Sequence, residues 1–376
     1  MTNWKIPLYK IFTDDEDLNL ITKVVSRGNN WAMGPEIEEF ENSIKNYVNA
    51  DYCLTLNSGT SALHASLLAY EIQPNDEIIV PSFSFIATAN SVLFVDGKPI
   101  FADIEEDTFG LDPKSIQQNI TSKTKCIIPM DYGGQGCKIF DIKNIADENN
   151  LILIEDGAES LGSSIKGKKI GSISDTTIFS FCGNKVLTTG EGGAIVTNSS
   201  KIYEKIKLLR SHGRADASDY FTNPSLSQYV GLGYNWRMST LTATLGITQL
   251  QKIDKIIKMR KDNAQYLSEK LSKISEIQTP NPIDEHIYQM YTIRLTDQQI
   301  RDNLHDFLTD KEIFSKIYFH PIHNTQFYKK SNPNKKLNMT ELIAQQVLTL
   351  PLYPNMTNEE KDYLVNCIFE FFELKK

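Results

Sequence analysis

Short apolar runs alternate with amphipathic stretches over the first half of the chain. Runs rich in β-branched residues predict strands at residues 52–56, 77–80, 99–103, 124–129, 151–155, 176–181 and 194–197. Helical spacing of apolar positions predicts helices between several of them, at residues 87–95, 113–119 and 139–148. Alternation of strand and helix is typical of a mostly parallel sheet with helices on both faces, so we expect an α/β fold.

The two ends of the chain follow a different pattern. Residues 1–50 predict an entry arm with two helices, the second with Ile37, Phe40 and Ile44 on one face. Helical patterns continue at residues 202–209 and 240–274, and later segments mix strand-like runs (288–295, 314–319) with helices (298–308, 339–347, 358–371). We therefore expect a large domain over residues 1–250, followed by a long connecting helix and a smaller α+β domain over residues 251–376.

Composition narrows the class of protein. Of 376 residues, 40% are hydrophobic and 23% are charged, which excludes disordered and fibrous classes. A formal net charge of −8 gives no general attraction to nucleic acid or to an anionic membrane. The start lacks the order of a signal peptide and no apolar run is long enough to cross a bilayer, so we expect a cytoplasmic protein without membrane contact. Five scattered cysteines predict neither a disulfide frame nor a zinc site.

Two further segments look like ligand motifs and are rejected. Residues 162–168 have the spacing of a nucleotide-phosphate loop, but Lys169 stands where Ser or Thr must bind magnesium. His320 and His323 flank Pro321, which spoils a helical pairing, and no carboxylate lies nearby in the sequence. We expect substrate contact or packing from these histidines, and no metal site.

Lys185 lies on a glycine-rich connection between the strands predicted at 176–181 and 194–197. Lysine is almost never buried without a partner, and neighbouring glycines such as Gly183 and Gly190 let the backbone approach a ligand closely. Such a lysine is a candidate for covalent chemistry with a carbonyl compound, although a solvated loop lysine is the alternative.

Two other segments favour the chemical interpretation. Asp156 follows the buried run 151–155, and ligands gather at the ends of strands in α/β sheets, so Asp156 is expected in the same crevice as Lys185. An amine with an anion suits pyridoxal phosphate, whose aldehyde needs an amine and whose ring nitrogen needs a carboxylate. Ser58, Gly59 and Thr60 open a helix after the strand at 52–56 and can form a phosphate site, although an ordinary helix cap has the same sequence.

With these pieces in order, the sequence resembles the DegT/DnrJ/EryC1/StrS family of sugar aminotransferases, from Pro7 to Pro354. The resemblance implies the fold of aspartate aminotransferase (fold type I) and pyridoxal 5′-phosphate as cofactor. The motifs that carry it are the segments 57–63, 81–88, 155–159, 180–185 and 233–238.

The resemblance also implies a role for each site residue. Lys185 matches the Schiff-base lysine, Asp156 the partner of the ring nitrogen, and Phe85 the aromatic that stacks on the ring. Asn235 matches an asparagine that reaches the phosphate of the neighbouring subunit, which implies a homodimer with shared active sites. The implied cofactor-binding residues are Ser58, Gly59, Thr60, Phe85, Asp156, Glu159, Ser180, Lys185 and Asn235.

Glu159 is a variable position in the family, often glutamine or histidine, near the phenolic oxygen of the cofactor. A carboxylate there would repel a phenolate unless they share a proton, so Glu159 is expected to share one or to tune the acid–base behaviour of the lysine–cofactor bond. Ala158-Glu159 and the ending Gly183-Asn184-Lys185 are similar to perosamine synthases and related 4-aminotransferases. The expected reaction is therefore transfer of an amino group from L-glutamate to a nucleotide-linked 4-keto-6-deoxyhexose, for surface glycan synthesis.

Other functions remain open at this stage. A 3-keto sugar or amino-cyclitol aminotransferase would keep the same cofactor residues, and a sensor or scaffold of the same fold would bind no cofactor. Deoxygenating relatives have lost the lysine, which is present here. The expected substrate contacts are Trp31, Thr88, His212, Arg237, Tyr318 and His320.

Overall fold

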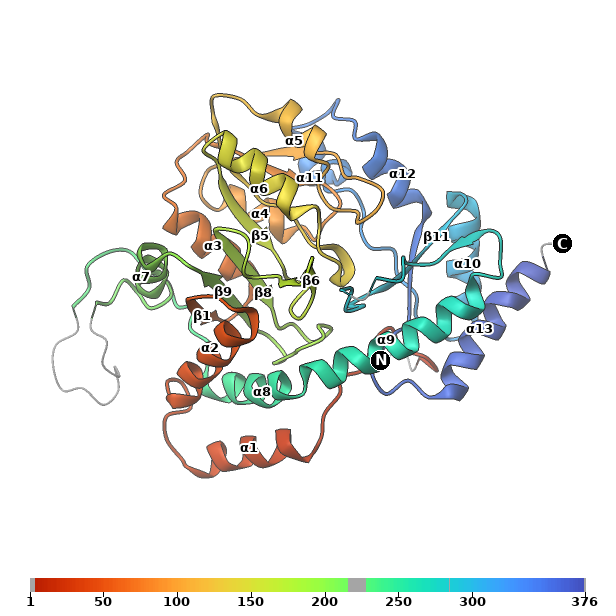
Figure 1. Ribbon diagram of the computed structural model, residues 1–376, viewed down its shortest axis with the longest axis horizontal. Helices are drawn as coiled ribbons and strands as arrows, with labels where there is room; N and C mark the ends of the chain where they lie inside the picture. Colours follow the sequence, from red (N-terminus) through yellow and green to blue (C-terminus); the bar gives the residue numbers. More distant parts are fainter. Residues whose placement is uncertain (1–3, 216–227, 284, 375–376) are drawn as a thin grey trace.

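The computed structural model describes residues 4–215, 228–283 and 285–374, and these contain a large seven-stranded sheet, a small three-stranded sheet and a two-stranded hairpin (Figure 1). The large sheet has seven strands in the order β1-β9-β8-β5-β4-β2-β3. Neighbouring strands run parallel except at β9, which is antiparallel to β8 and to β1. The strands are β1 (Tyr52–Leu56), β2 (Glu77–Pro81), β3 (Lys98–Ala102), β4 (Thr124–Ile127), β5 (Ile152–Asp156), β8 (Thr176–Ser180) and β9 (Gly193–Thr197). The predicted mostly parallel α/β sheet is confirmed.

Alternate residues of these strands enter different apolar clusters, because successive side chains point to opposite faces of a sheet. Leu54, Ile154 and Ile178 pack with α3 (Gly59–Ala69), α4 (Ala87–Leu93) and α7 (Ser200–Leu209). On the other face, Leu153 packs with α5 (Pro113–Asn119) and α6 (Ile139–Glu148), and Phe179 with α2 (Pro35–Val48) and α8 (Thr240–Gln251). Both faces are thus buried, which explains why the strands are continuous apolar runs.

The helix predicted over residues 240–274 is two helices. α8 ends at Gln251 and α9 (Ile253–Leu271) begins after Lys252. The ammonium group of Lys252 forms ion pairs with Asp14, which caps α1 (Asp15–Ser26), and with Asp17 of that helix. The break therefore coincides with the point where α1 is tied to the body of the protein, and α9 continues towards the small sheet (Figure 1).

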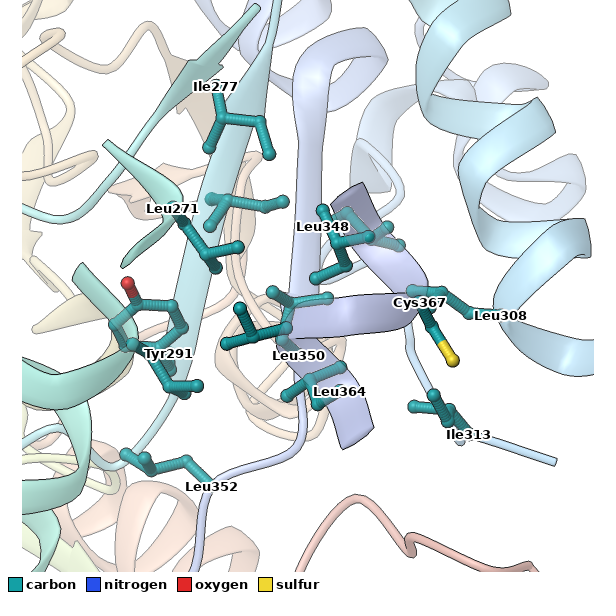
Figure 2. Close-up of a cluster of buried hydrophobic side chains, with 14 of the residues drawn as sticks. Leu271, Ile277, Tyr291, Leu308, Ile313, Leu348, Leu350, Leu352, Leu364 and Cys367 are labelled. Carbon is teal, nitrogen blue, oxygen red and sulfur yellow. The ribbon is translucent and has the colours of Figure 1, made fainter. Parts of the chain in front are cut away.

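The small sheet has three antiparallel strands, β10 (Ile277–Gln278), β11 (Tyr291–Leu295) and β12 (Val347–Leu350). Tyr291, Leu348 and Leu350 from these strands meet Leu271 of α9 and Leu364 of α13 (Asn358–Glu373) in one apolar cluster (Figure 2). Together with α10 (Gln298–Asp310), these elements form a separate core beside the large sheet.

Two predictions for this part of the chain were wrong. Residues 314–319 form no named strand; Lys316 makes only an isolated bridge to Thr349. The strand β12 was not predicted, because its apolar residues follow α12 (Asn338–Gln346) without a break and resemble its continuation. In contrast, residues 162–169 contain a short hairpin, β6 (Ser164–Ile165) with β7 (Lys168–Lys169), and no helix, which agrees with rejecting a nucleotide-phosphate loop.

One segment of the C-terminal part returns to the large sheet. Residues 322–346 contain α11 (Gln326–Lys329) and α12, and Tyr328 joins the apolar cluster of α3 and α4. Its hydroxyl donates to Asn90 Oδ1 at 2.8 Å, and the amide of Thr340 donates to Asp103 Oδ1 at 2.8 Å. The domain boundary at residue 250 stays a prediction. Among the described helices, none has the length and apolar character needed to cross a membrane.

Candidate active site

Three strands bring the predicted site segments to one edge of the large sheet. Because β9 is antiparallel to its neighbours, its first residue, Gly193, lies opposite the last residues of β1 and β8, Leu56 and Ser180. A Cβ atom on Gly193 would lie 2.5 Å from the carbonyl carbon of Ser58, and one on Gly59 would lie 3.0 Å from Ser180 Cβ. The phosphate-type loop and Ser180 are therefore packed together across two glycines.

The start of α3 forms an anion-binding cup. Ser58 caps the helix: its Oγ accepts the amide proton of Ser61 at 3.0 Å. The backbone N–H groups of Gly59 and Thr60 lie in the first turn, where no carbonyl of the helix stands four residues before them. They therefore have no partner within the helix and can donate to a phosphate. Asn57 joins the segment 233–238 to this cup, because its amide donates to Trp236 O at 2.8 Å.

Lys185 lies on the loop that joins β8 to β9. Its side chain is 14% exposed, and Nζ lies 3.2 Å from Glu159 Oε1. The second oxygen of Glu159 accepts the amide proton of Gly133 at 2.9 Å, which fixes the carboxylate. The amine of Lys185 is thus mostly shielded from water and held by an anion.

Gln289, which the sequence analysis did not identify, holds the lysine loop from both sides. Its Oε1 accepts the amide proton of Val186 at 2.7 Å, and its Nε2 donates to Asn184 O at 2.8 Å. Arg260 in turn donates to Tyr288 O at 2.7 Å and Gln289 O at 2.9 Å, and burial lowers the pKa of Arg260 to about 10. A single amide inside the apolar run 287–291 was the available signal for Gln289.

Asp156, at the end of β5, is buried. Its Oδ2 accepts the hydroxyl proton of Thr88 at 2.7 Å, and its Oδ1 accepts the amide proton of Ala158 at 3.2 Å. Burial raises the pKa of Asp156, while these two hydrogen bonds and the positive charge of Lys185 act in the opposite direction. The structure therefore places Thr88 against Asp156, and its predicted substrate contact stays a prediction.

Two more buried carboxyl groups lie behind Asp156. Asp131 accepts the amide proton of Cys137 at 2.9 Å and the hydroxyl proton of Ser160 at 2.8 Å, and burial raises its pKa to about 6. Glu155 accepts from Thr177 Oγ1 at 2.8 Å, and burial raises its pKa to about 8. Glu155 Oε1 has no hydrogen-bond partner among the described residues. We infer that Glu155 is a neutral carboxylic acid at pH 7.

Phe85 and Tyr318 are two of the aromatic residues predicted for the site. Phe85 is 60% exposed on the segment after β2. Tyr318 lies close to Glu159 and Lys185: burial and the Glu159 charge raise the pKa of its phenol, and the Lys185 charge lowers it. Its main-chain oxygen accepts the hydroxyl proton of Tyr132 at 2.7 Å.

The other predicted substrate contacts lie in different surroundings. Trp31 donates from Nε1 to Val24 O at 3.2 Å, and His212 and His320 are exposed. Arg237 Nη1 donates to Ser211 Oγ at 3.1 Å and, like Met33, Arg210 and Glu41, lines a cavity of about 670 Å³. The pKa of Arg237 is lowered by burial and by the charges of Arg214 and Arg210. Lys185 is not among the described residues that line this cavity, so these residues stay predicted contacts.

The donor set fits pyridoxal phosphate. The chain offers a shielded amine (Lys185), a buried carboxylate (Asp156) on which the lysine charge acts, and a helix start whose amides have no partner within the helix (Gly59, Thr60). These three groups match the aldehyde, ring nitrogen and phosphate of that cofactor. Within the described ranges, no group of three or more His, Cys, Asp or Glu side chains is placed to hold a metal ion.

Comparison with known proteins gives a consistent result. A family model described as the DegT/DnrJ/EryC1/StrS aminotransferase family matches residues 12–369. GDP-perosamine synthase of Vibrio cholerae is 31% identical over 371 residues, which cover 98% of this chain and 99% of that protein. PseC of Helicobacter pylori, an aminotransferase of pseudoaminic acid biosynthesis, superposes with a TM-score of 0.92 at 26% identity, covering 98% of this chain and 99% of PseC. Spr1654 of Streptococcus pneumoniae, a putative sugar aminotransferase in its PLP form, superposes with a TM-score of 0.90 at 25% sequence identity, covering 98% of each chain.

Proposed function

The chain belongs to the DegT/DnrJ/EryC1/StrS aminotransferase family and is a pyridoxal phosphate-dependent sugar aminotransferase, and within this class we propose a specific reaction. The proposed reaction moves an amino group from L-glutamate to the ketone of a nucleotide-linked 4-keto-6-deoxyhexose, giving a nucleotide amino sugar for surface glycans. GDP-perosamine synthase of Vibrio cholerae, at 31% identity, supports this choice of substrate.

The observation that carries the proposal is the contact network around Lys185. Its amine meets Glu159, and Asp156 with Thr88 lies close enough for the lysine charge to act on the aspartate. Since a solvated loop lysine would have neither a buried position nor a fixed carboxylate partner, this network favours chemistry over a plain surface role.

We assign the cofactor contacts as follows. Lys185 would hold the aldehyde carbon, Asp156 the ring nitrogen, and Phe85 one face of the ring. The start of α3 (Ser58, Gly59, Thr60) and Ser180 would hold the phosphate, completed by Asn235 of a second copy in a homodimer. When bound, the cofactor supplies a protonated ring that stabilises negative charge at the reacting carbon.

The residues of this chain then perform the proton transfers. The amine of Lys185 would first act as general base and take a proton from the donor carbon. It would then act as general acid and return that proton at the other end of the reacting C–N bond. Glu159, fixed by the amide of Gly133, orients that amine through the ion pair between Lys185 Nζ and Glu159 Oε1. The hydrogen bonds that Thr88 and Ala158 donate to Asp156 favour its ionised form, against the burial that raises its pKa.

Incubation with a panel of substrates tests the proposal. Purified protein is given L-glutamate and, in separate reactions, 4-keto-6-deoxyhexoses linked to GDP, UDP or dTDP, and a 3-keto isomer. We expect 2-oxoglutarate and an amino sugar with a mass about one unit higher than that of the keto sugar only with a 4-keto substrate, measured by mass spectrometry. Amination of only the 3-keto sugar would show that the chain is a 3-keto sugar aminotransferase. Absence of cofactor absorbance from the purified protein would support the sensor alternative.

A further inference from the structure

A buried row of hydrogen bonds joins the segment that carries Phe85 to α12. Ser82 Oγ lies 2.7 Å from His323 Nδ1, and His323 Nε2 lies 3.1 Å from Glu341 Oε1. Ser82 is fully buried, and the imidazole of His323 has no exposed surface. Buried polar groups are costly unless each finds a partner, so this arrangement requires a specific set of donors and acceptors.

The order serine, histidine, carboxylate is also that of hydrolase triads, but the surroundings exclude that role. Ser82 has no path to a substrate, because none of its surface is exposed. Its Oγ already accepts the backbone amide proton of His323 at 3.0 Å. A nucleophile must reach a carbonyl carbon beside an oxyanion site, so Ser82 is a structural member of the row.

The contacts define one protonation state of His323. Glu341, as a carboxylate, accepts a proton from Nε2, which leaves Nδ1 as the acceptor for the Ser82 hydroxyl. A second proton on Nδ1 would reverse this contact: Nδ1 would donate to Ser82 Oγ, and the Ser82 hydroxyl proton would lose its acceptor on the ring. Burial lowers the pKa of His323, which agrees with a neutral ring, whereas the carboxylate of Glu341 acts to raise it.

Other charged groups around the ring are few. Lys335, from the loop before α12, lowers the pKa of His323, and Asp103, after β3, raises it. The ring of Phe101 lies 6.4 Å from the imidazole and closes the remaining side. Among the described groups, Glu341 is thus the charged partner in direct contact with His323.

The row continues into the candidate site. Residues 82–88 are held at their start, where Ser82 O accepts the amide proton of Ile322 at 2.8 Å. They are held at their end, where Ser84 Oγ lies 2.7 Å from Thr88 Oγ1 and Thr88 donates to Asp156. Phe85 projects between these two attachments. Loss of either attachment would free the ring of Phe85.

We propose that His323 is a positioning residue for the cofactor: by holding Ser82 it fixes residues 82–88, and with them the Phe85 ring and the Thr88 hydroxyl on Asp156. The proposal rests on the cofactor contacts assigned above to Phe85 and Asp156. A protonated His323 no longer accepts from Ser82, so acid weakens cofactor binding. The ordinary pKa of histidine is about 6.5 and the folded value is lower, so this loss begins below about pH 6.5.

Two substitutions separate the two hydrogen bonds of the ring, and a third serves as a control. His323→Asn places an amide oxygen near the position of Nδ1, so it keeps the acceptor for Ser82 and cannot titrate. His323→Gln carries its amide further out, towards Glu341, and leaves Ser82 without an acceptor. His305→Gln, at an exposed histidine beside Asp306, is the matched control.

The first measurement is the dissociation constant of pyridoxal phosphate for apo protein, by absorbance between pH 5.5 and 8. We expect His323→Gln to weaken binding about tenfold at every pH, the scale of one unsatisfied buried donor. His323→Asn should bind within about threefold of wild type at pH 8 and lose less affinity than wild type towards pH 5.5. The control should match wild type throughout.

The second measurement is hydrogen exchange in the cofactor-free protein. In His323→Gln and in Ser82→Ala, the peptide covering residues 82–88 should exchange at least about tenfold faster, while peptides from β11 and α13 stay unchanged. Equal loss of protection everywhere would indicate a general stability role and overturn the proposal, as would wild-type affinity in His323→Gln. Wild-type protein that binds no cofactor would instead refute the proposed function.

Discussion

The inner and outer parts of the candidate site differ in how completely one chain builds them. The inner part, around Lys185, Glu159, Asp156 and Gln289, is buried and its polar groups are paired with each other. The outer part contains exposed apolar side chains close to the exposed Asn235, with Tyr229 60%, Val230 61% and Leu232 80% exposed. Exposed apolar groups gathered in one place are typical of an interaction surface, so in the proposed homodimer a second copy would complete the outer part, whereas one chain builds the inner part.

The largest expected effect comes from the inner part. Lys185→Ala removes both the amine that holds the cofactor and the proton carrier, so turnover should fall about 10,000-fold or more and the visible absorbance of bound cofactor should disappear. Circular dichroism should show an unchanged fold. Lys258→Ala, at an exposed lysine paired with Asp262, is the control and should keep full activity. Undiminished turnover in Lys185→Ala would refute the assignment.

The outer part is tested by complementation between two impaired variants, assayed at a cofactor concentration that saturates wild type but not Asn235→Ala. Asn235→Ala should lower cofactor affinity about tenfold or more, because a charged phosphate loses one hydrogen bond. When this variant is mixed with Lys185→Ala during refolding, half of the dimers contain one site with both native residues, so about a quarter of the wild-type activity should return. Activity no greater than the sum of the two separate variants would show that each chain builds its whole site alone.

Substitution of Gln289 tests whether activity depends on the two hydrogen bonds that hold the loop on either side of Lys185. Gln289→Ala leaves Asn184 O and Val186 N without partners, which should lower the free energy of unfolding by about 2–4 kcal/mol. The displaced lysine loop should lower turnover about tenfold to a hundredfold, measured at a temperature where the variant is folded. The control is Gln265→Ala, at an exposed glutamine beside Glu269. An unchanged rate would limit Gln289 to a role in stability.

Glu155 should affect stability and leave turnover unchanged. The folded pKa of Glu155, about 8, is raised above its unfolded value, so the unfolded chain loses its proton first as pH rises. Stability therefore falls between about pH 4.5 and pH 8, and Glu155→Gln should remove part of this decline, giving about 1–3 kcal/mol more stability than wild type at pH 8 and little change at pH 5. Denaturant unfolding at both values measures this, with the exposed Glu148→Gln as control. An equal decline in Glu155→Gln would show that other groups cause it.

The sequence predicted the parts of the molecule that depend on local pattern. The strand at 52–56 and the helices at 113–119 and 139–148 match β1, α5 and α6, since their apolar spacing and end signals agree. Lys185 and Asp156 were found because a charge at the end of a buried strand is unusual. These are features that neighbouring residues determine.

The remaining features depend on residues far apart in the chain. Gln289 lies more than 100 residues from Lys185, and His323 contacts Ser82 across 241 residues. His323 was noticed only as half of an apparent metal motif, because the sequence does not show that Ser82 and Glu341 lie on either side of its ring. The break between α8 and α9 was missed for the same reason: Lys252 is a good helix former, and its partners Asp14 and Asp17 lie at the other end of the sequence.

Gly193 offers a practical filter for sorting related genes. Any larger residue at that position would push against the carbonyl carbon of Ser58 and force α3 away from the sheet, whatever happens at the lysine. A homologous gene product that keeps the lysine but has lost this glycine should have a damaged phosphate cup. Checking this one codon before cloning would therefore separate genes for active enzymes from genes for proteins that share only the fold.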